Sequence, residues 1–375
     1  MIAERITTPE KSPSPNGHGR YAKILEIGPI APPHAGWGVR IGYVLEALKS
    51  RDVQTAALDV GPTRKIKRPH CDTVHSSLDY ARKVFRYLRS GYRIHTHLNG
   101  ESPKAYALVL YSTILSWMFR RRAVLTWHGG LGYRFFPSNG NPLVDTIHRT
   151  IFRLSERVIC NDEIIKRKIM EYGVPEDKVV PIPAFSPQYL EFDRVELSAE
   201  IQRFLADHRP TLFCYTYYRP EFYLPELVTA LRTLVDGSPR LGLVLVGYTA
   251  GSEPIRRRLR EEGLENNVCL AGNLGRNEFL TLLEQCDLCV RTHQRDGISS
   301  SVLEALALGV PVVAADNPLR PPQVWTYPAE DPAALAQRVQ EVLSLPPDAR
   351  RPQSPEILDT VADEVAILTG SPAAG

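Results

Sequence analysis

The chain has 375 residues, of which 43% are hydrophobic and 23% are charged. This composition is typical of an ordinary globular protein, and the length favours two domains over a single core. The six scattered cysteines suit a reducing cytoplasm and argue against a disulfide framework.

The formal net charge of +3 hides a strongly basic first third. Residues 20–122 contain 18 Lys and Arg against 7 Asp and Glu, a balance of +11. Phe85, Tyr87 and Tyr92 lie among the basic clusters. Solvated helix faces would explain this pattern, and attraction to anionic lipid headgroups or an anionic acceptor is the alternative. No nucleic-acid motif accompanies the charge, so we expect no nucleic-acid partner.

Two segments bear on targeting and membranes. Residues 1–19 hold Pro, Ser, Gly and charges without an apolar core, so we expect a disordered tail and no signal peptide. Residues 105–119 are the most apolar stretch, but a spanning helix needs about 20 such residues. We therefore expect this stretch to be a helix packed on a sheet, with membrane dipping as the alternative.

The first half of the chain alternates strands and helices. Strands are expected at "AKILEIG", "TAALDV", "YRIHTHL", "AVLTW", "RVICND" and "KVVPI", and the last helix, "EIIKRKIMEYG", should close on Gly173. A Gly/Pro-rich loop, "PIAPPHAGWG", follows the first strand and leads into a helix. Such alternation of apolar, β-branched strands with helices predicts a parallel doubly wound sheet.

The alternation restarts after residue 190 and runs from the strand "TLFCYTY" to the helix "DPAALAQRVQEVLS". The sequence thus predicts an α/β fold with two Rossmann-like doubly wound parallel-sheet domains facing each other across a cleft. We place these domains at residues 20–190 and 191–350, and we expect residues 351–375 to pack back on the first. The cleft between them is the expected site, beyond the carboxyl ends of the strands.

Three familiar fingerprints are missing. Neither half shows G-x-G-x-x-G at its first turn, and the chain has no G-x-x-x-x-G-K-[ST] and no G-x-S-x-G. The sequence therefore lacks the motif that would best support a nicotinamide-dependent enzyme, a P-loop ATPase or an esterase.

The segment "RDGISSSVLEALALGVPVVAAD", residues 295–316, carries the clearest chemistry. Its first residues form a loop at the carboxyl end of a strand, and Ser299 or Ser300 is expected to cap a helix that stops at Gly309. Unpaired amides at the start of that helix offer an anion site. Asp296 in the loop and Glu304 on the helix can accept hydrogen bonds from sugar hydroxyls, an arrangement that fits a sugar nucleotide.

This segment resembles the acid-x₇-acid motif of the retaining glycosyltransferases of family four, whose two-Rossmann-domain architecture is called GT-B. The matching residues run from Asp296 to Ser299 and from Glu304 through Gly309-Val310-Pro311-Val312-Val313. Flanking segments over most of residues 22–345 also fall in the family's order. An ordinary βαβ unit with an incidentally acidic loop is the alternative.

The resemblance implies roles for particular residues. Asp296 would hold donor-sugar hydroxyls at the catalytic centre, and Glu304 would bind the ribose. The stretch Gly297, Ile298, Ser299 and Ser300 would face the sugar or phosphate through its backbone. Gly36, Trp37 and Gly38 match the glycine-rich turn near donor and acceptor, and His128 in "LTWHGG" matches the histidine beside the reacting sugar. We interpret His95 and His97 as structural.

Two departures from the family pattern stand out. Relatives carry Arg and Lys after the first strand of the second domain to neutralise the diphosphate, whereas this chain has Tyr217 and Phe222. Arg219 is the nearby cation in sequence that could substitute. Asp replaces the usual Glu at position 296, which shortens that side chain by one methylene group.

The resemblance implies a retaining glycosyltransferase that moves a sugar from a nucleotide-diphosphate sugar to a glycan or polyprenyl-linked acceptor, in bacterial exopolysaccharide or cell-envelope glycan synthesis. We expect no metal and no cofactor, because no acidic metal triad is present and helix amides can carry the phosphate charge. The basic first third suggests a cytoplasmic protein that is peripheral at an anionic inner membrane surface. A non-catalytic sugar-nucleotide or glycan-binding protein on the same fold is the alternative.

Overall fold

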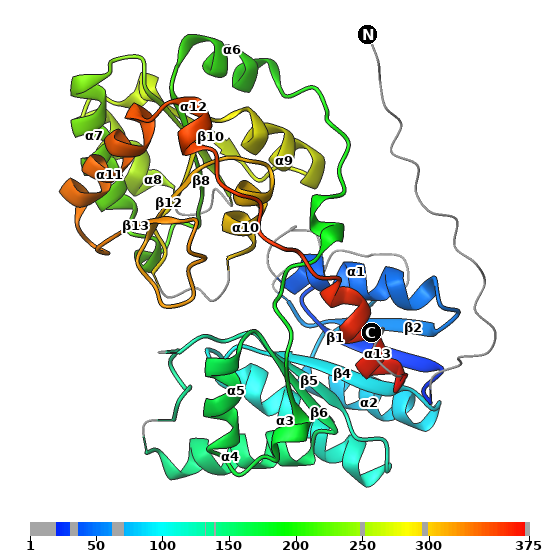
Figure 1. Cartoon of the computed structure of the whole chain (residues 1–375). Helices are drawn as coiled ribbons and strands as arrows, with labels where there is room; N and C mark the ends of the chain where they lie inside the picture. The colour runs from blue at the N-terminus through cyan, green and yellow to red at the C-terminus, as the bar shows by residue number, and fades with distance from the viewer. Residues whose placement is uncertain are drawn as a thin grey trace.

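The computed structural model describes residues 20–30, 37–61, 71–131, 133–138, 140–247, 252–294 and 299–371. Figure 1 shows two α/β domains joined by an extended segment, with the C-terminal helix returning to the first domain. The predicted fold class is confirmed, since each domain is built on a wholly parallel sheet in the described residues.

The N-terminal domain has a seven-stranded sheet of order β3-β2-β1-β4-β5-β6-β7. Its strands are β1 (Lys23–Gly28), β2 (Gln54–Asp59), β3 (Cys71–Thr73), β4 (Arg93–Leu98), β5 (Val124–Trp127), β6 (Arg157–Cys160) and β7 (Val179–Pro181). Its helices are α1 (Trp37–Lys49), α2 (Ser77–Arg89), α3 (Pro103–Met118), α4 (Pro142–Leu154) and α5 (Glu163–Met170). The strand order reverses between β1 and β4, the point at which such sheets open a crevice for ligands.

The C-terminal domain has a six-stranded sheet of order β10-β9-β8-β11-β12-β13. Its strands are β8 (Thr211–Tyr215), β9 (Gly242–Val246), β10 (Val268–Gly272), β11 (Leu288–Arg291), β12 (Val312–Ala315) and β13 (Trp325–Tyr327). Its helices are α6 (Ala199–Asp207), α7 (Leu224–Gly237), α8 (Glu253–Glu261), α9 (Arg276–Gln285), α10 (Ser300–Ala307), α11 (Pro332–Ser344) and α12 (Pro347–Arg350). The order reverses between β8 and β11, so each domain has its own crevice.

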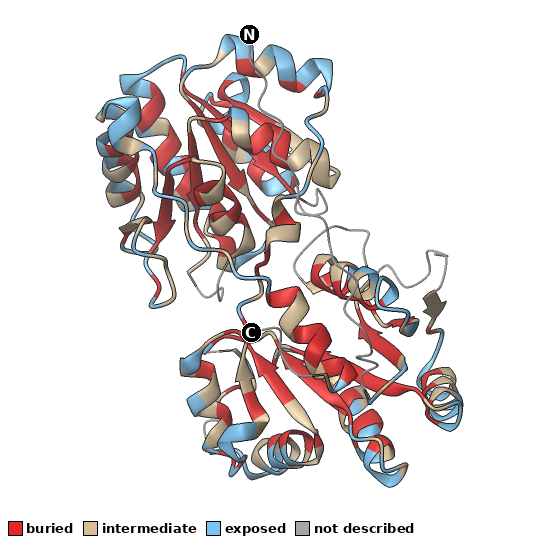
Figure 2. Cartoon of the chain, turned by 45° about the vertical axis from the view of Figure 1, so that its right-hand side comes forward, coloured by how far each residue is buried: buried red, intermediate tan, exposed pale blue. Residues whose placement is uncertain are grey.

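Both sheets are enclosed by helices, and Figure 2 shows the strands as the most buried part of each domain. Because both faces of each sheet are covered, the strands are continuous apolar runs such as "GLVLV" in β9. Gly173 and Gly309, predicted helix stops, both adopt a left-handed backbone, with φ of 74° and 76°. Among the described residues no helix is both long enough and apolar enough to cross a bilayer.

The final helix, α13 (Thr360–Thr369), packs against α1 of the N-terminal domain. Val361, Val365 and Leu368 are almost completely buried beside Ile24 and Val44. Burying each of these three side chains contributes about 1.5–3 kcal/mol. The chain therefore crosses between the domains twice, once before α6 and once before α13 (Figure 1).

Candidate active site

A cavity of about 220 Å³ lies between the two domains at the carboxyl ends of their strands. Its walls come from the loop after β5, the start of α5, and the loops after β11 and β12. The lining residues are Gly130, Leu131, Asp162, Ile164 and Ile165 on one side and Gln294, Asp316, Asn317, Pro318 and Leu319 on the other. The segment "LTWHGG" thus ends at this cavity with Gly130, and Gln294, the residue before "RDGISSS", also lines it.

A larger hollow of about 680 Å³ lies on the outer edge of the C-terminal domain, beside α6 and α8. Arg203, Asp207, Arg256 and Arg260 line it, and it lies away from the carboxyl ends of the strands. We assign the site to the smaller cavity, because parallel sheets position ligands at that end.

Glu304 lies on α10 and is 2% exposed. Arg276, the first residue of α9, places Nη1 2.8 Å from Oε1 of Glu304. Burial raises the pKa of the Glu304 carboxyl, and the Arg276 charge opposes that rise. Arg276 also donates to the carbonyl oxygen of Tyr189 in the linker, so this ion pair touches the segment joining the domains. Arg276 is the one ionic partner of Glu304 among the described residues, so this buried carboxylate has acceptor capacity left for a ligand.

The helix α10 starts at Ser300, with Ser299 at its N-cap. The Ser299 side chain does not accept a hydrogen bond from the helix amides; its hydroxyl lies 3.1 Å from that of Ser301. The first turn of α10 contains no acidic residue. These amides are therefore available to an anion. The predicted residues Asp296, Gly297 and Ile298 lie outside the described part of the chain.

Aromatic rings occupy the end of β8, where relatives of the resembled family carry cations. Tyr217 and Phe222 are in ring contact, with centroids 5.6 Å apart. Arg219 has a side chain that is 68% exposed and lies 3.8 Å from Glu221. Arg291 at the end of β11 is buried against Phe222, with its guanidinium 5.3 Å from the ring centroid, and donates to the Tyr215 carbonyl. Positive charge is thus present at this crevice, although it comes from different positions.

On the N-terminal side, His128 follows β5 and is half-buried. Its ring lies 4.6 Å from the Trp37 ring at the start of α1, and Gly38 is buried in the same turn. The structure therefore brings Trp37, with Gly38 next to it in the chain, to His128. Gly36, the remaining residue of that turn, lies outside the described residues.

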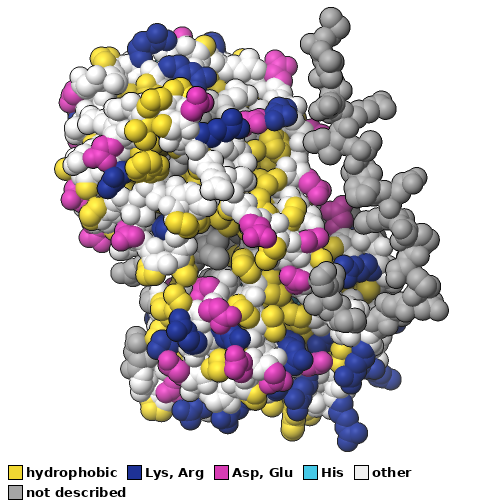
Figure 3. Space-filling model, viewed as in Figure 1, with side chains coloured by type: hydrophobic (Ala, Val, Ile, Leu, Met, Phe, Trp, Pro, Cys, Tyr) yellow, Lys and Arg dark blue, Asp and Glu magenta, His cyan; other side chains and the backbone are white. Residues whose placement is uncertain are grey.

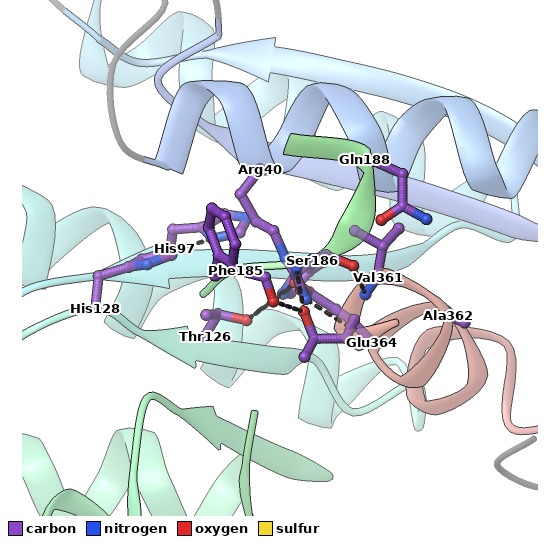
Figure 4. A network of polar contacts seen from close by, with 12 residues as sticks. Arg40, His97, Thr126, His128, Phe185, Ser186, Gln188, Val361, Ala362 and Glu364 are labelled. Carbon is purple, nitrogen blue, oxygen red and sulfur yellow. Dashed lines mark hydrogen bonds and ion pairs between the residues drawn. The ribbon is translucent and has the colours of Figure 1, made fainter. Parts of the chain in front are cut away.

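His128 also contacts a buried polar network that the sequence did not link to it (Figure 4). His97 Nδ1 lies 2.9 Å from His128 Nε2, and His97 Nε2 lies 3.1 Å from Glu26 Oε2. The other oxygen, Glu26 Oε1, lies 2.9 Å from His95 Nδ1. His95 and His97 thus form part of the structure's core, as we interpreted them, and His97 also contacts the candidate site.

The network continues to the C-terminal helix. His95 Nε2 lies 2.8 Å from the Thr126 hydroxyl and 3.6 Å from Glu364 Oε1. Glu364 Oε2 accepts a 2.6 Å hydrogen bond from Arg40 Nε. Arg40 in turn donates to the side chain and the carbonyl of Thr360 at 2.7 and 2.6 Å. Acidic and basic side chains alternate from Glu26 through His95 and Glu364 to Arg40, so the buried charges of the network are paired.

Electrostatics divide the network into charged and neutral parts. Burial works to raise the pKa of Glu26, but the charge and hydrogen bond of His95 outweigh it and hold that pKa at about 2. Burial works to lower the pKa of His95, but Glu26 and Glu364 raise it. Burial and the neighbouring His95 charge lower the pKa of His97, and burial with the nearby cations lowers that of His128 far below its usual range. His97 and His128 are therefore neutral at pH 7.

The described residues include one group with the spacing of a metal site, Glu26, His95 and His97, whose ligand atoms lie within 4.8 Å of one another. A metal would need a lone pair from each ring at those atoms. Here each Glu26 oxygen faces one ring nitrogen at hydrogen-bond distance, and Glu26 is deprotonated, so both rings donate protons to it. The group fits a hydrogen-bonded network better than it fits an ion.

Five charged residues of this region were not predicted from the sequence. Four of them, Glu26, Arg40, Arg291 and Glu364, are 7% exposed or less, and Arg276 is ion-paired to the buried Glu304. A charged residue within or directly after an apolar strand, as in "KILEIG" and "LCVR", was a usable signal for Glu26 and Arg291. Nothing in the local sequence signals the partners of Arg276 and Glu364.

Comparisons with known proteins agree with this geometry. Residues 199–354 match the family model of Glycosyl transferases group 1, and residues 38–185 match that of Glycosyltransferase Family 4. No curated protein matches the chain.

Several solved structures share the two-domain fold. Alr3699/HepE of Anabaena, in complex with UDP and glucose, matches with a TM-score of 0.61 at 16% identity, over 93% of this chain and 95% of that chain. Sucrose-phosphate synthase (tll1590) of Thermosynechococcus elongatus matches with a TM-score of 0.62 at 17% identity, over 93% and 94%. A putative UDP-N-acetylglucosamine 2-epimerase of Listeria monocytogenes matches with a TM-score of 0.64 at 15% identity, over 93% and 96%.

At these identities the structural likeness shows the GT-B fold, and the assignment to a family comes from the sequence models. Those models cover most of both domains, one on each side of the cavity. The chain therefore belongs to the group 1 glycosyltransferases.

Proposed function

We propose that the protein transfers a sugar, with retention at the anomeric carbon, from a nucleoside-diphosphate sugar to a glycan or polyprenyl-linked acceptor in bacterial exopolysaccharide or cell-envelope glycan synthesis. The observation that carries the donor class is the buried Glu304 one turn inside α10, whose first amides have no side-chain cap. A carboxylate there can accept both ribose hydroxyls while the amides face the diphosphate. The UDP complex of Alr3699/HepE supports the same class of donor on this fold.

Transfer from such a donor requires stabilisation of the leaving phosphate. The helix dipole and amides of α10 supply part of that charge, and the exposed Arg219 supplies a cation from the loop after β8. In front-face attack the leaving phosphate itself takes the acceptor proton, so no separate nucleophile is needed. Asp296 and His128 would hold the reacting sugar from the two sides, and closure of the domains would exclude water.

A membrane-associated acceptor is supported by the outer surface of α2 and α3. Six large apolar side chains are at least 37% exposed there, namely Leu78, Phe85, Tyr111, Ile114, Trp117 and Met118. The two helices are adjacent, since Phe85 contacts Phe119 with ring centroids 5.5 Å apart and the Tyr111 hydroxyl donates to the Ala81 carbonyl. We call these six residues the α2–α3 apolar patch. Apolar surface of this kind, next to cations, fits a lipid headgroup boundary.

Basic side chains flank the patch on both helices. Arg82, Arg86 and Arg89 are exposed on α2, and Arg120 and Arg122 are exposed just after α3. Figure 3 shows Lys and Arg gathered along the lower edge of the N-terminal domain. Each cation near an anionic membrane surface contributes about 1 kcal/mol. We therefore propose a cytoplasmic protein that is peripheral at the inner membrane face.

The transfer reaction is tested with a panel of nucleoside-diphosphate sugars against simple glycan and polyprenyl-phosphate acceptors. We expect one donor to be consumed in an acceptor-dependent way, with NMR showing the same anomeric configuration in donor and product. Inversion would contradict the retaining mechanism. Donor binding without turnover across the panel would favour the non-catalytic binding protein.

Membrane association is tested by co-sedimentation with phosphatidylglycerol or phosphatidylcholine vesicles at low salt. We expect binding to the anionic vesicles and a clear loss in Trp117→Ser. The matched control is Leu143→Ser, because Leu143 is 69% exposed on α4, outside the patch. A wild-type protein that stays in the supernatant with anionic vesicles would contradict the peripheral location.

A further inference from the structure

The rings of three histidines and one carboxylate form a continuous hydrogen-bonded line behind the candidate site, and Figure 4 shows the part formed by His97 and His128. The line runs from His95 through Glu26 and His97 to His128. Glu26 and His95 are completely buried, His97 is 5% exposed, and His128 at the end is half-buried. Glu26 and His95 are paired neighbours on β1 and β4, so the rigid sheet sets their positions. His128 is the most exposed member of the line and comes two residues before Gly130, which lines the cavity between the domains.

The positions of the protons along this line follow from the acceptor at its centre. An ionised carboxylate can only accept, so His95 Nδ1 and His97 Nε2 must each donate a proton to Glu26. A neutral imidazole carries a single N–H. With its proton on Nε2, His97 presents a bare Nδ1 to His128.

The bare nitrogen of His97 then sets the proton of His128. The two nitrogens are 2.9 Å apart, a hydrogen-bond distance that requires one donor. Because His97 Nδ1 is the acceptor, His128 Nε2 is the donor. The remaining nitrogen of His128, Nδ1, has no hydrogen-bond partner among the residues that the structure describes.

The protonation state of His95 keeps Glu26 ionised, which the proton positions in the line require. Its Nε2 faces the Thr126 hydroxyl at 2.8 Å, and that hydroxyl donates in turn to Glu364 at 3.5 Å. The Thr126 oxygen therefore accepts from His95, which donates from both nitrogens and is an imidazolium. Its charge lies between Glu26 and Glu364, while Arg40 balances the second acid. The cation beside Glu26 favours the ionised carboxylate that the proton assignment needs.

We propose that Glu26, acting through His97, fixes His128 in the tautomer with its proton on Nε2, so that Nδ1 offers a lone pair as a hydrogen-bond acceptor in the active site. Glu26 and His97 are positioning residues. Trp37, the first residue of α1, packs against the His128 ring. His128 would thus accept a hydrogen bond from a substrate hydroxyl and would not donate one to a sugar oxygen or to phosphate. The inference about the substrate rests on the proposed function, whereas the tautomer itself does not.

The tautomer is read directly from the full-length protein without substrate, by two-bond proton–nitrogen NMR with ¹⁵N-labelled histidine at neutral pH. A His128→Gln sample assigns the signals. We expect a pyrrole-type Nε2 and a pyridine-type Nδ1 for His128. A pyrrole-type Nδ1 or a protonated ring would overturn the proposal. Metal analysis runs alongside, and a stoichiometric ion lost on His95→Ala would also overturn it.

The variant Glu26→Gln tests the origin of the tautomer. An amide in place of the carboxylate can donate to His97 Nε2, which moves the His97 proton to Nδ1 and the His128 proton to its own Nδ1. We expect the His128 Nδ1 signal to gain pyrrole character. His128 signals identical to the wild type would overturn the role of Glu26. His148 is the internal control, because its Nε2 bonds the Tyr106 hydroxyl at 2.6 Å, outside the line, and its signals should not move.

Should Glu26→Gln fail to fold, the wild-type spectrum alone decides the proton positions. Once a donor is known, the same variant should lower kcat about 10- to 100-fold with little change in donor KM, the loss expected for one substrate hydrogen bond. Unchanged kcat with an altered tautomer would refute the contact with substrate. Absence of transfer in the wild type would refute the proposed function and leave the tautomer result standing.

Discussion

The two domains support their candidate site residues, His128 and Glu304, in different ways. In the N-terminal domain, His128 contacts a continuous series of hydrogen-bonded and ion-paired side chains that runs from His97 to Arg40. Glu364 of α13 is part of this series and pairs with Arg40. On the C-terminal side Glu304 rests on one long side chain, Arg276 of α9. The first arrangement holds a ring in one orientation, and the second leaves a buried acid to be bound by a ligand. We therefore expect substitutions on the first side to change folding or rate, and substitutions on the second side to change donor affinity.

The largest effect should follow Glu364→Ala, which breaks the buried pair with Arg40 and removes the carboxylate beside His95, although Thr360 of α13 still accepts from Arg40. Leaving a buried charge unpaired costs about 3–5 kcal/mol of unfolding free energy. Urea unfolding measures this loss. The control is Glu341→Ala, whose exposed pair with Arg338 should contribute less than about 1 kcal/mol. Equal losses of unfolding free energy in both variants would show that the buried pair stabilises the fold no more than an exposed pair does.

The next effect is on donor binding in Glu304→Ala. Loss of two hydrogen bonds to a charged acceptor, each about 1.5–3 kcal/mol, should weaken binding at least about 100-fold and abolish detectable affinity. Calorimetry with the nucleoside diphosphate measures it. Glu253→Ala, an exposed acid on α8, is the control and should bind normally. Wild-type affinity in Glu304→Ala would remove this residue from the site.

His128→Ala should separate rate from affinity. We expect donor affinity within about twofold of the wild type and kcat lower by about 10²-fold, because the side chain acts on the reacting sugar. Steady-state kinetics with calorimetry distinguishes the two. The exposed His75 provides the control, His75→Ala, with unchanged kcat. Turnover at the wild-type level in His128→Ala would place the reaction elsewhere.

The smallest effect should come from Arg219→Ala. An exposed cation beside a diphosphate contributes about 1 kcal/mol, so we expect donor KM to rise about fivefold. Arg219→Lys should recover most of the loss, and the effect should shrink at high salt. An unchanged KM would indicate that Arg219 does not replace the missing cations at positions 217 and 222.

The alternation of apolar strands and helices was enough to predict both sheets, since a buried parallel strand and its following helix leave local patterns. The boundaries of β11 and α10 follow from "DLCV" and from Ser299 and Gly309 for the same reason. The short strands β3 ("CDT") and β13 ("WTY") were not predicted because they lack the run of β-branched residues that marks the equally short β7 ("VVP").

The network behind His128 could not be predicted from sequence alone. Arg40 and Glu364 are 324 positions apart, and they meet only because the chain returns to α1 after the second domain. The position of Glu26 within an apolar strand signals a buried acid, but nothing in that strand indicates which side chains Glu26 meets. Among the predicted site residues, Trp37, Gly38 and His128 lie together, and Glu304 lies with Ser299 and Ser300 on α10. Their role in binding stays a prediction.

The most direct measurement is a crystal structure of the protein with UDP, or with whichever nucleoside diphosphate stabilises it best in a thermal-shift screen. We expect diphosphate oxygens at hydrogen-bond distance from the first amides of α10, and both ribose hydroxyls bound to the Glu304 carboxylate. A nucleotide bound in the outer hollow beside α6, with Glu304 still held only by Arg276, would contradict this expectation.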